Sequence, residues 1–315
     1  MKLLCVILNY KTAEMTLDAI RAARAALTTL DHRIDVVDND SQDGSFERLT
    51  AAVAEAGWPD VRVVQSGHNG GFGAGNNVAL RAALLEPEPP EFLYILNSDA
   101  FPAPDAIEAL VRFLEQHPRA GIAGSFIHGP DGDPHLTAFR FPSVASEALS
   151  GFRLGVLKRL LPEREVPIHP MPSETQRVDW LAGASMMFRR ELLQEVGLFD
   201  ETFFLYFEET DLCRRALLAG WECWYVMESR VAHIGSVSTG MKNKSRPMPR
   251  YWFDSRRHYF TKNHGAAYTW AANVLHAAGL LTFKARAGLQ NKPDPDPVNF
   301  LQDFARYNFV EKRPQ

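Results

Sequence analysis

The stretch Phe92-Leu93-Tyr94-Ile95-Leu96-Asn97-Ser98-Asp99 decides how this chain of 315 residues is expected to fold. Its five apolar residues are typical of a parallel β-strand that is buried on both faces. The polar residues that follow place the Asp99 carboxylate at the carboxyl end of that strand. A hard divalent cation such as Mg²⁺ or Mn²⁺ prefers oxygen ligands, usually one or two carboxylates together with substrate phosphates. Asp99 is therefore a candidate metal ligand.

The same alternation of apolar strand and polar end continues on both sides of this stretch. Further apolar runs that suit buried strands cover Leu3–Leu8, Ile34–Val37, Val61–Val64 and Ile122–Phe126. Stretches with helical spacing separate the strands, and they cover Thr16–Leu30, Ser45–Ala56, Ala74–Leu85 and Asp105–Gln116. This alternation predicts an α/β fold with a mostly parallel sheet flanked by helices. Ligands bind beyond the carboxyl ends of the strands in such sheets, so the chemistry is expected there.

The pattern changes after residue 128. Residues 128–177 are rich in Pro and Gly and indicate loops around one short helix, Val144–Leu161. Long loops in compact domains are often lids or binding loops. The end of the chain is expected to be helical at Tyr251–His264 and at Ala266–Leu289. We therefore expect two parts, an α/β domain over residues 1–240 and a C-terminal helical extension over residues 241–315.

Composition and charge exclude several classes of protein. The net charge of −4 and the pI of about 6.2 lack the basic footprint of a nucleic-acid-binding protein. The three cysteines, Cys5, Cys213 and Cys223, are too sparse for a disulfide framework or a structural zinc site. They suit a reducing, cytoplasmic compartment. The apolar N-terminus reads as a first buried strand, and no stretch approaches the roughly 20 apolar residues of a membrane span.

Polar residues also end the other predicted strands. Asn9 and Tyr10 close the first strand, and Asp38 and Asp40 follow the second. Such side chains can bond to a nucleobase or to ribose hydroxyls, but the same residue types are also required by a capped strand-to-helix turn. The third strand leads into a glycine-rich turn, Asn69-Gly70-Gly71-Phe72-Gly73-Ala74-Gly75-Asn76. Its small residues permit close approach to a ligand, although it matches neither the dinucleotide fingerprint nor a P-loop.

A second cluster of acids follows an aromatic run. Glu208, Glu209 and Asp211 crowd one helix start, directly after Phe203-Phe204-Leu205-Tyr206-Phe207. Acids at this position can simply complement the helix dipole. A carboxylate against an apolar wall is also where a raised pKa and general-base catalysis are expected. Further on, His233 ends another strand, and beside a carboxylate site this histidine becomes a candidate metal ligand.

Together these segments resemble the family 2 glycosyltransferases, enzymes with the GT-A (Rossmann-like) fold. The resemblance spans nearly all of residues 3–240, and it is strongest to bacterial rhamnosyltransferase-like members that build surface polysaccharides. The motifs that carry it, in order, are Val6-Ile7-Leu8-Asn9-Tyr10, Val36–Ser45, Asn69–Asn77, Leu96-Asn97-Ser98-Asp99, Trp180–Ala184, Phe199–Arg215 and His233. It implies a nucleotide-diphosphate sugar donor, a saccharide or lipid-linked glycan acceptor, Mg²⁺ or Mn²⁺, and transfer with inversion.

The resemblance also implies roles for individual residues. The metal would rest on Asp99 and His233, and the acceptor side would be lined by Trp180 and Gly183. The donor would be bordered by polar and small residues at the strand ends, namely Asn9, Tyr10, Asp38, Asp40, Asn69, Gly71, Asn76, Asn97 and Ser98.

The family's catalytic base falls at Glu209, beside Glu208. Two positions depart from the family pattern: Asn97 stands where the first metal-binding carboxylate is expected, and Glu209 is one methylene longer than the usual Asp. Asp211 competes with Glu209 for the role of base. These departures keep open a second reading, a catalytically impaired module that only binds nucleotide sugars or glycans. A nucleotidyltransferase is disfavoured because Asn9-Tyr10-Lys11-Thr12 lacks the expected Gly-rich loop with an Arg.

The C-terminal segment leaves two alternatives open. The apolar run Ala266–Leu289, with Lys284 and Arg286 near its end, fits a helix packed on the catalytic domain or in a homodimer interface. It also fits a helix lying in the plane of the inner face of a membrane, which would suit a lipid-linked acceptor. Before it, residues 251–259 hold aromatic and basic side chains that either contact donor phosphates or form a core stripe with the cations outward.

Overall fold

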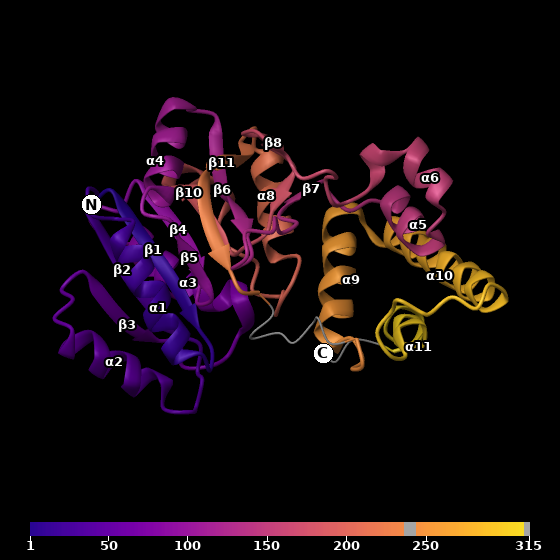
Figure 1. Cartoon of the computed structure of the whole chain (residues 1–315), viewed down its shortest axis with the longest axis horizontal. Coiled ribbons are helices and arrows are strands. Elements are labelled where there is room, and N and C mark those ends of the chain that lie inside the picture. Colours follow the sequence, from indigo (N-terminus) through magenta and orange to yellow (C-terminus); the bar gives the residue numbers. More distant parts are fainter. Residues whose placement is uncertain (236–243, 312–315) are drawn as a thin grey trace.

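The computed structural model describes residues 1–235 and 244–311. Within these residues, a nine-stranded mixed sheet with helices on both faces forms one part of the molecule, and a group of helices forms the other (Figure 1). The strand order is β3-β2-β1-β4-β10-β6-β11-β5, with β8 paired to β11. The predicted mostly parallel sheet flanked by helices is confirmed, since β3, β2, β1 and β4 are parallel neighbours.

Every strand and helix predicted in the first 128 residues is present, with shifted ends. The strands are β1 (Leu3–Asn9), β2 (His32–Asp38), β3 (Val61–Gln65), β4 (Phe92–Asn97), β5 (Ala100–Pro102), β6 (Ala120–His128), β7 (Ala138–Phe139), β8 (Gln176–Val178), β9 (Trp180–Leu181), β10 (Ser185–Arg189) and β11 (Glu222–His233). The helices of this part are α1 (Ala13–Ala25), α2 (Ser45–Glu55), α3 (Gly71–Leu84), α4 (Ala106–Gln116), α7 (Arg190–Val196) and α8 (Glu208–Leu218).

The central strands are apolar throughout because helices cover both faces of the sheet. Alternate residues of β1 point to opposite sides: Cys5 packs in a core with α1, α2 and α4, whereas Val6 packs in a core with α3, α7 and α8. A parallel strand in such a sandwich has no solvent-facing side, which explains the continuous apolar runs. The polar residues after β1, β2 and β4 therefore emerge together at one edge of the sheet.

The second part of the molecule, here called the helical extension, combines two separate segments of the chain (Figure 1). Its helices are α5 (Val144–Phe152), α6 (Gly155–Leu160), α9 (Arg250–His264), α10 (Ala266–Leu289) and α11 (Phe300–Ala305), and short helical turns follow at Pro162–Arg164 and Arg306–Val310. Arg256 of α9 is buried and donates to Glu147 of α5 at 2.8 Å and to Asn273 of α10 at 2.6 Å. Although burial opposes it, the Arg256 charge lowers the pKa of Glu147 to about 2. This ion pair ties the inserted segment to the C-terminal helices.

Two elements differ from expectation. The single helix predicted over Val144–Leu161 is wrong: α5 ends at Phe152, the next residue, Arg153, adopts a left-handed conformation with φ of 50°, and α6 starts separately. Helix α3 starts at Gly71, three residues before the expected start, because its glycines are needed where neighbouring segments press against its first turn. Helix propensity alone disfavours glycine there, so tertiary packing decides.

Helices α5 and α10 cross with their backbones nearly in contact. A Cβ atom on Gly279 would lie 2.5 Å from the amide nitrogen of Phe152 and 2.6 Å from the carbonyl carbon of Gly151. Gly279→Ala should therefore lower the free energy of unfolding by about 2–3 kcal/mol, because the two backbones must separate. Urea unfolding measures this change. A Cβ atom at Gly288 on the same helix meets open space, so Gly288→Ala should instead stabilise the protein by about 0.5–1 kcal/mol. Equal effects of the two substitutions on the free energy of unfolding would contradict the close crossing of α5 and α10.

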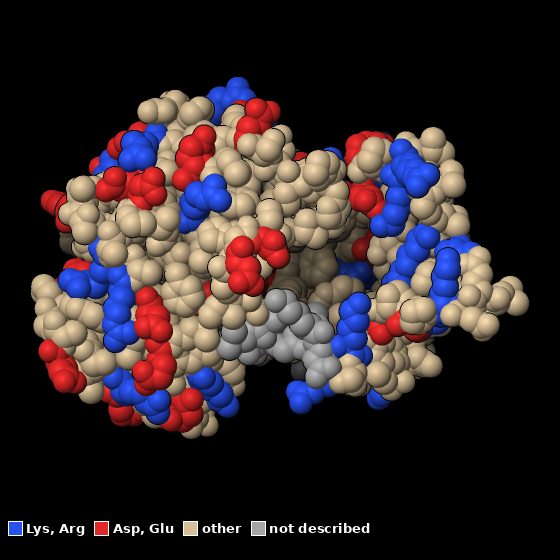
Figure 2. Space-filling view, viewed as in Figure 1, with Lys and Arg blue, Asp and Glu red and all other residues tan. Residues whose placement is uncertain are grey.

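The charges of the chain divide unevenly between the two parts. Residues 144–165 and 244–311 hold 14 Lys and Arg and 8 Asp and Glu, whereas residues 1–143 and 166–235 hold 17 and 30. The modest net charge of the whole chain therefore conceals an acidic sheet domain and a basic helical extension. Figure 2 shows Lys and Arg side chains gathered over the lobe that contains α6 and α10. No helix within the described ranges is long and apolar enough to span a membrane.

Candidate active site

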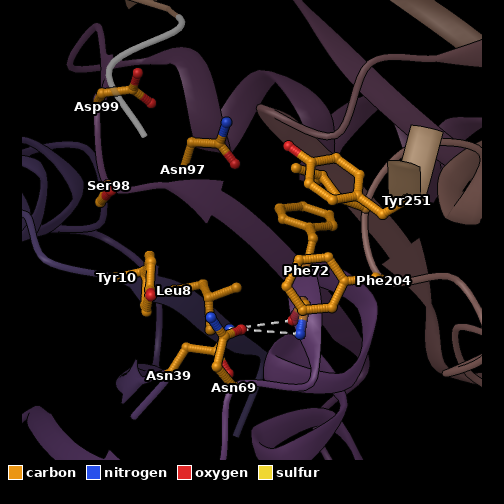
Figure 3. A pocket seen from close by; sticks show the side chains of 12 residues that line it. Leu8, Tyr10, Asn39, Asn69, Phe72, Asn97, Ser98, Asp99, Phe204 and Tyr251 are labelled. Carbon is orange, nitrogen blue, oxygen red and sulfur yellow. Dashed lines mark hydrogen bonds between the residues drawn. The ribbon is translucent and has the colours of Figure 1, made fainter. Parts of the chain in front are cut away.

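A cavity of about 340 Å³ opens at the carboxyl ends of β1, β2 and β4. Figure 3 shows Leu8 and Tyr10 on one side of it, aromatic rings on the other, and Asn97 with Asp99 at one end. The full lining is Leu8, Tyr10, Asn39, Asn69, Gly71, Phe72, Asn97, Ser98, Asp99, Phe204, Leu205 and Tyr251. An apolar wall with a few converging polar groups is the usual form of a small-molecule site.

Asn9 and Asp38 lie beneath the cavity and not in its wall. Asn9 is fully buried, and its amide donates to Asp38 at 2.6 Å while its carbonyl accepts from the Thr16 hydroxyl at 2.7 Å. The second Asp38 oxygen accepts from the backbone amide of Ser41 at 3.1 Å. These bonds fix the turns after β1 and β2, so both residues hold the residues that line the cavity. Asp40, with a left-handed φ of 54°, accepts from Gln42 and does not reach the cavity.

The glycine-rich turn is shaped by the aromatic run opposite. A Cβ atom on Gly71 would lie 1.7 Å from the carbonyl oxygen of Phe204, and the Phe72 amide donates to that same oxygen at 3.0 Å. Gly71 also has a φ of +90°, which L side chains rarely adopt. Asn69 accepts from the Asn39 amide at 2.9 Å, and both face the cavity (Figure 3). Asn76 is buried and bonds back to the carbonyl of Phe72.

A carboxylate and an imidazole meet at one end of the cavity. Asp99 Oδ1 lies 3.0 Å from His233 Nε2, and the Asn97 amide lies 3.5 Å from the same nitrogen. The Gly235 backbone amide holds the other Asp99 oxygen at 3.2 Å. Ser98 lines the wall beside them and contacts the Thr12 hydroxyl at 3.1 Å. Across the described residues, no group of three or more His, Cys, Asp or Glu side chains could hold a metal ion, so this pair offers only part of a coordination shell.

Glu208 and Glu209 begin α8 directly behind the cavity wall. Tyr206 and Phe207, both with φ of 71°, make the sharp turn that buries these acids. Burial raises the pKa of Glu208 well above its usual range, and the neighbouring Glu209 carboxylate adds to the effect. Burial also raises the pKa of Glu209 to about 7, although the backbone amides of Glu209 and Gly183 oppose the shift. One oxygen of each carboxyl group is buried without a hydrogen-bond partner among the described residues. Glu209 can therefore be ionised near neutral pH and still accept a proton.

Asp211 occupies a different environment from Glu209. It is fully buried and accepts from Arg215 Nε and Lys262 Nζ, both at 2.8 Å, and from the Asn263 amide at 3.1 Å. The three donors engage both of its oxygens, and two of them come from α9. Asp211 thus joins α8 to the helical extension, and both of its oxygens already accept hydrogen bonds from the protein.

Gly183 connects the cavity to Glu209. A Cβ atom on Gly183 would lie 3.0 Å from the Phe72 ring and 3.7 Å from Glu209 Oε1, and the next residue, Ala184, accepts from the Asn97 backbone amide at 3.0 Å. Trp180, three residues earlier, stacks on Phe139 with ring centroids 4.1 Å apart and donates to the carbonyl of Arg140. The absence of a side chain at Gly183 therefore lets the Phe72 ring of the cavity wall and the Glu209 carboxyl group pack close to the same backbone position.

Several residues of the cavity wall were not among the predicted site residues. Asn39 had a visible signal, since it is the first residue after β2. Phe72 lies in the glycine-rich turn, and Phe204 and Leu205 lie in the aromatic run before α8. Other residues of these two segments were the predicted site residues. Tyr251 comes from α9 and packs on Tyr206 and Phe204, with ring centroids 6.2 and 5.4 Å apart. The helical extension therefore contributes directly to the cavity. Arg256 fits neither alternative left open for the cations of this segment, since it is buried and does not line the cavity.

Comparison with known proteins decides the family. The family model described as "Glycosyl transferase family 2" matches residues 5–197. The chain belongs to glycosyl transferase family 2. This transferase is 32% identical over 218 residues, 65% of the chain and 67% of the relative, to the N-acetylglucosaminyl-diphospho-decaprenol L-rhamnosyltransferase of Mycobacterium tuberculosis. It is 29% identical to rhamnosyltransferase WbbL of Escherichia coli (strain K12), over 52% of the chain and 60% of that relative.

Solved structures confirm that the transferase has the GT-A fold. The mannosyltransferase PcManGT of Pyrobaculum calidifontis, in complex with GDP-Man and Mn²⁺, is similar with a TM-score of 0.58 and 15% identity, over 93% of this chain and 76% of that one. GalNAc-T7 with UDP, GalNAc and Mn²⁺ also gives a TM-score of 0.58 at 15% identity, over 98% of this chain and 54% of that one. These structures confirm the predicted fold, and the family model with the rhamnosyltransferase relatives confirms the predicted family and glycosyl-transfer activity.

Proposed function

We propose that this transferase moves a sugar, rhamnose from dTDP-rhamnose or the sugar of a UDP-sugar, to a hydroxyl of a saccharide or lipid-linked glycan, with inversion, in the synthesis of bacterial surface polysaccharide. The names of the two rhamnosyltransferase relatives support the sugar, and the mycobacterial one supports a lipid-linked acceptor. The observation that carries the mechanism is Glu209, whose buried oxygen lacks a partner and whose pKa is raised to about 7 beside the donor cavity.

The residues at the end of the cavity fit a divalent cation. Carboxylate and imidazole suit Mn²⁺, and a carboxylate with an amide oxygen suits Mg²⁺. Asp99 and His233 would hold the ion, Asn97 would be a neutral neighbour, and the donor's phosphates would complete the shell. When bound, the cation would neutralise charge that develops on the departing diphosphate. This metal set is supported by the 3.0 Å approach of Asp99 to His233 and by the Mn²⁺ complexes of the structural neighbours.

The protein's own residues divide the remaining work. Tyr10, Asn39 and Asn69 would hold the nucleoside between polar edges and the apolar wall. An acceptor that enters beside Gly183 would place its hydroxyl at Glu209, which removes the proton as the new glycosidic bond forms. A single displacement of this kind inverts the anomeric centre. Glu208, neutral through burial, keeps this region free of a second negative charge.

A thermal-shift screen tests the donor assignment. A ligand that binds only the folded state raises the melting temperature, so dTDP-rhamnose or a UDP-sugar should stabilise the protein more with Mn²⁺ than with EDTA. GDP-sugars serve as the comparison. If no nucleotide sugar shifts the melting temperature, either with Mn²⁺ or with EDTA, the donor assignment is overturned.

The second candidate, a module that binds nucleotide sugars without turning them over, is favoured by Asn97 in the metal motif. It predicts metal-dependent nucleotide binding by calorimetry without donor hydrolysis or transfer to any acceptor. Release of free nucleoside diphosphate from the donor, with Mn²⁺ present, would exclude it.

A further inference from the structure

The solvent face of α10 is apolar along the whole helix. At 100° per residue, six apolar residues fall within one arc of about 100°, and they are Trp270, Val274, Ala278, Leu281, Ala285 and Leu289. The three largest are well exposed: Trp270 by 64%, Leu281 by 59% and Leu289 by 89%. The opposite side of α10, including Ala272, Gly279 and Leu280, is buried. These six residues are here called the α10 stripe. Val274 and Ala278 are half-buried and the other four are exposed, so the described part of the chain covers this apolar face only in part.

Basic residues surround the α10 stripe. On the helical projection, Lys284 lies about 40° beyond one edge of the stripe and Arg286 about 60° beyond the other, and Lys292 follows the helix. Lys284 pairs with Asp294, and Arg286 donates to the carbonyl of Phe152 at 3.0 Å, so both cations also have partners within the extension. Arg286 and Arg153 both contact the Phe283 ring, with guanidinium carbons 5.7 and 4.6 Å from its centroid. The helical extension as a whole carries the excess of Lys and Arg described above. An apolar face with cations at its edges matches the interior and the headgroups of an anionic lipid surface.

We propose that the α10 stripe lies in the plane of an anionic lipid bilayer, with its apolar side chains among the acyl chains and its flanking cations at the headgroups. Trp270 suits the boundary, where indole rings are enriched. A second copy of the chain fits the stripe less well. A twofold contact would bring Lys284 and Arg286, and two extensions of the same positive sign, against one another.

This placement orients the catalytic cavity. Helix α10 begins directly after Lys262 and Asn263, whose side chains bond to Asp211 on α8. The same helix α8 carries Glu209, so docking of α10 fixes the base relative to the bilayer. The consequence for lipid-linked acceptors rests on the proposed function, but bilayer binding itself does not.

Vesicle flotation tests the proposal without any need for turnover. The full chain should float with vesicles of equimolar phosphatidylcholine and phosphatidylglycerol and much less with phosphatidylcholine alone. Substituting Trp270, Leu281 and Leu289 together by Ser should reduce binding at least tenfold, since each loses buried apolar area. Added salt should also weaken binding. The matched control substitutes Leu85 and Leu218, exposed leucines of the sheet domain, by Ser and should float like the wild type.

Three outcomes would overturn the proposal. The wild type could fail to float with either vesicle, or the stripe variant could float like the control. In the third, the wild type dimerises in solution, as measured by light scattering, and the stripe variant is monomeric while neither binds vesicles. A transfer assay with a water-soluble acceptor separates this proposal from the proposed function: the stripe variant should match the wild type there and lose rate only with acceptor embedded in vesicles.

Discussion

Glu209→Gln should lower kcat by about a thousandfold while the donor still binds. Removal of a general base costs typically 10²–10⁴ in rate, and Gln keeps the size of the side chain. In the wild type, kcat/KM should rise with pH through about 7, because Glu209 must be ionised to accept the proton. In the variant that limb should vanish. Initial rates across pH, with donor affinity by calorimetry, measure both; normal turnover by the variant would remove Glu209 from the mechanism.

The same substitution should change the pH dependence of stability. The pKa of Glu209 is about 7 when folded and lies near its ordinary value of 4.5 when unfolded. The folded state therefore holds a proton that the unfolded state has lost, and the free energy of unfolding falls as pH rises from about 4.5 to about 7. Glu209→Gln should melt at a higher temperature than the wild type at pH 8, with a smaller difference at pH 5.

Asp211→Asn is the matched control on the same helix. It weakens the contacts to Arg215 and Lys262, so it should lower the free energy of unfolding by about 2–3 kcal/mol. Because both Asp211 oxygens are already engaged by Arg215, Lys262 and Asn263 and Glu209 is the proposed base, the pH limb of kcat/KM near 7 should stay. Loss of that limb in this variant, and not in Glu209→Gln, would transfer the role of base to Asp211.

Asp99→Asn should lower kcat/KM by about 10²–10³-fold, because the proposed metal site would lose its carboxylate ligand. The variant keeps the shape of the side chain, so the melting temperature without ligand serves as the folding control. When activity is titrated with Mn²⁺, the rate of the variant should depend much less on the Mn²⁺ concentration than the rate of the wild type does. Asn97→Asp should act in the opposite direction and tighten Mn²⁺ several-fold, since it adds a carboxylate next to His233. Wild-type rates and metal response in Asp99→Asn would disprove the metal set.

The sequence is sufficient to predict the sheet and its polar edge because buried parallel strands are apolar on both faces. It does not distinguish a residue that lines the cavity from one that supports it. Asn9 and Asp38 are residues at strand ends, as are Tyr10 and Asn39. Only the alternation of side chains along the strands and the geometry of the turns separate the two groups. The roles of the acids likewise depend on contacts from far along the chain. Besides its local partner Arg215, Asp211 accepts from Lys262 and Asn263, some 50 positions later, and no local pattern reveals these two contacts.

For the same reason, the sequence does not predict every residue that lines the cavity. Tyr251 reaches the cavity from a helix that lies beyond the matched family region. The break between α5 and α6 depends on a left-handed Arg153, a conformation that the residue type does not announce. The predicted boundary near residue 240 stays a prediction. We propose instead that residues 144–164 be grouped with the C-terminal helices.

The buried Arg256–Glu147 pair has a practical consequence for chimeric enzymes. Exchange of acceptor specificity between relatives by grafting everything after residue 240 would import a foreign partner for Glu147 and a foreign surface for Gly151. A graft that keeps both partners of the Arg256–Glu147 pair must be discontinuous: residues 144–164 are exchanged together with the C-terminal helices. Chimeras of this kind should therefore have three crossover points: one before α5, one after α6 and one before the C-terminal helices.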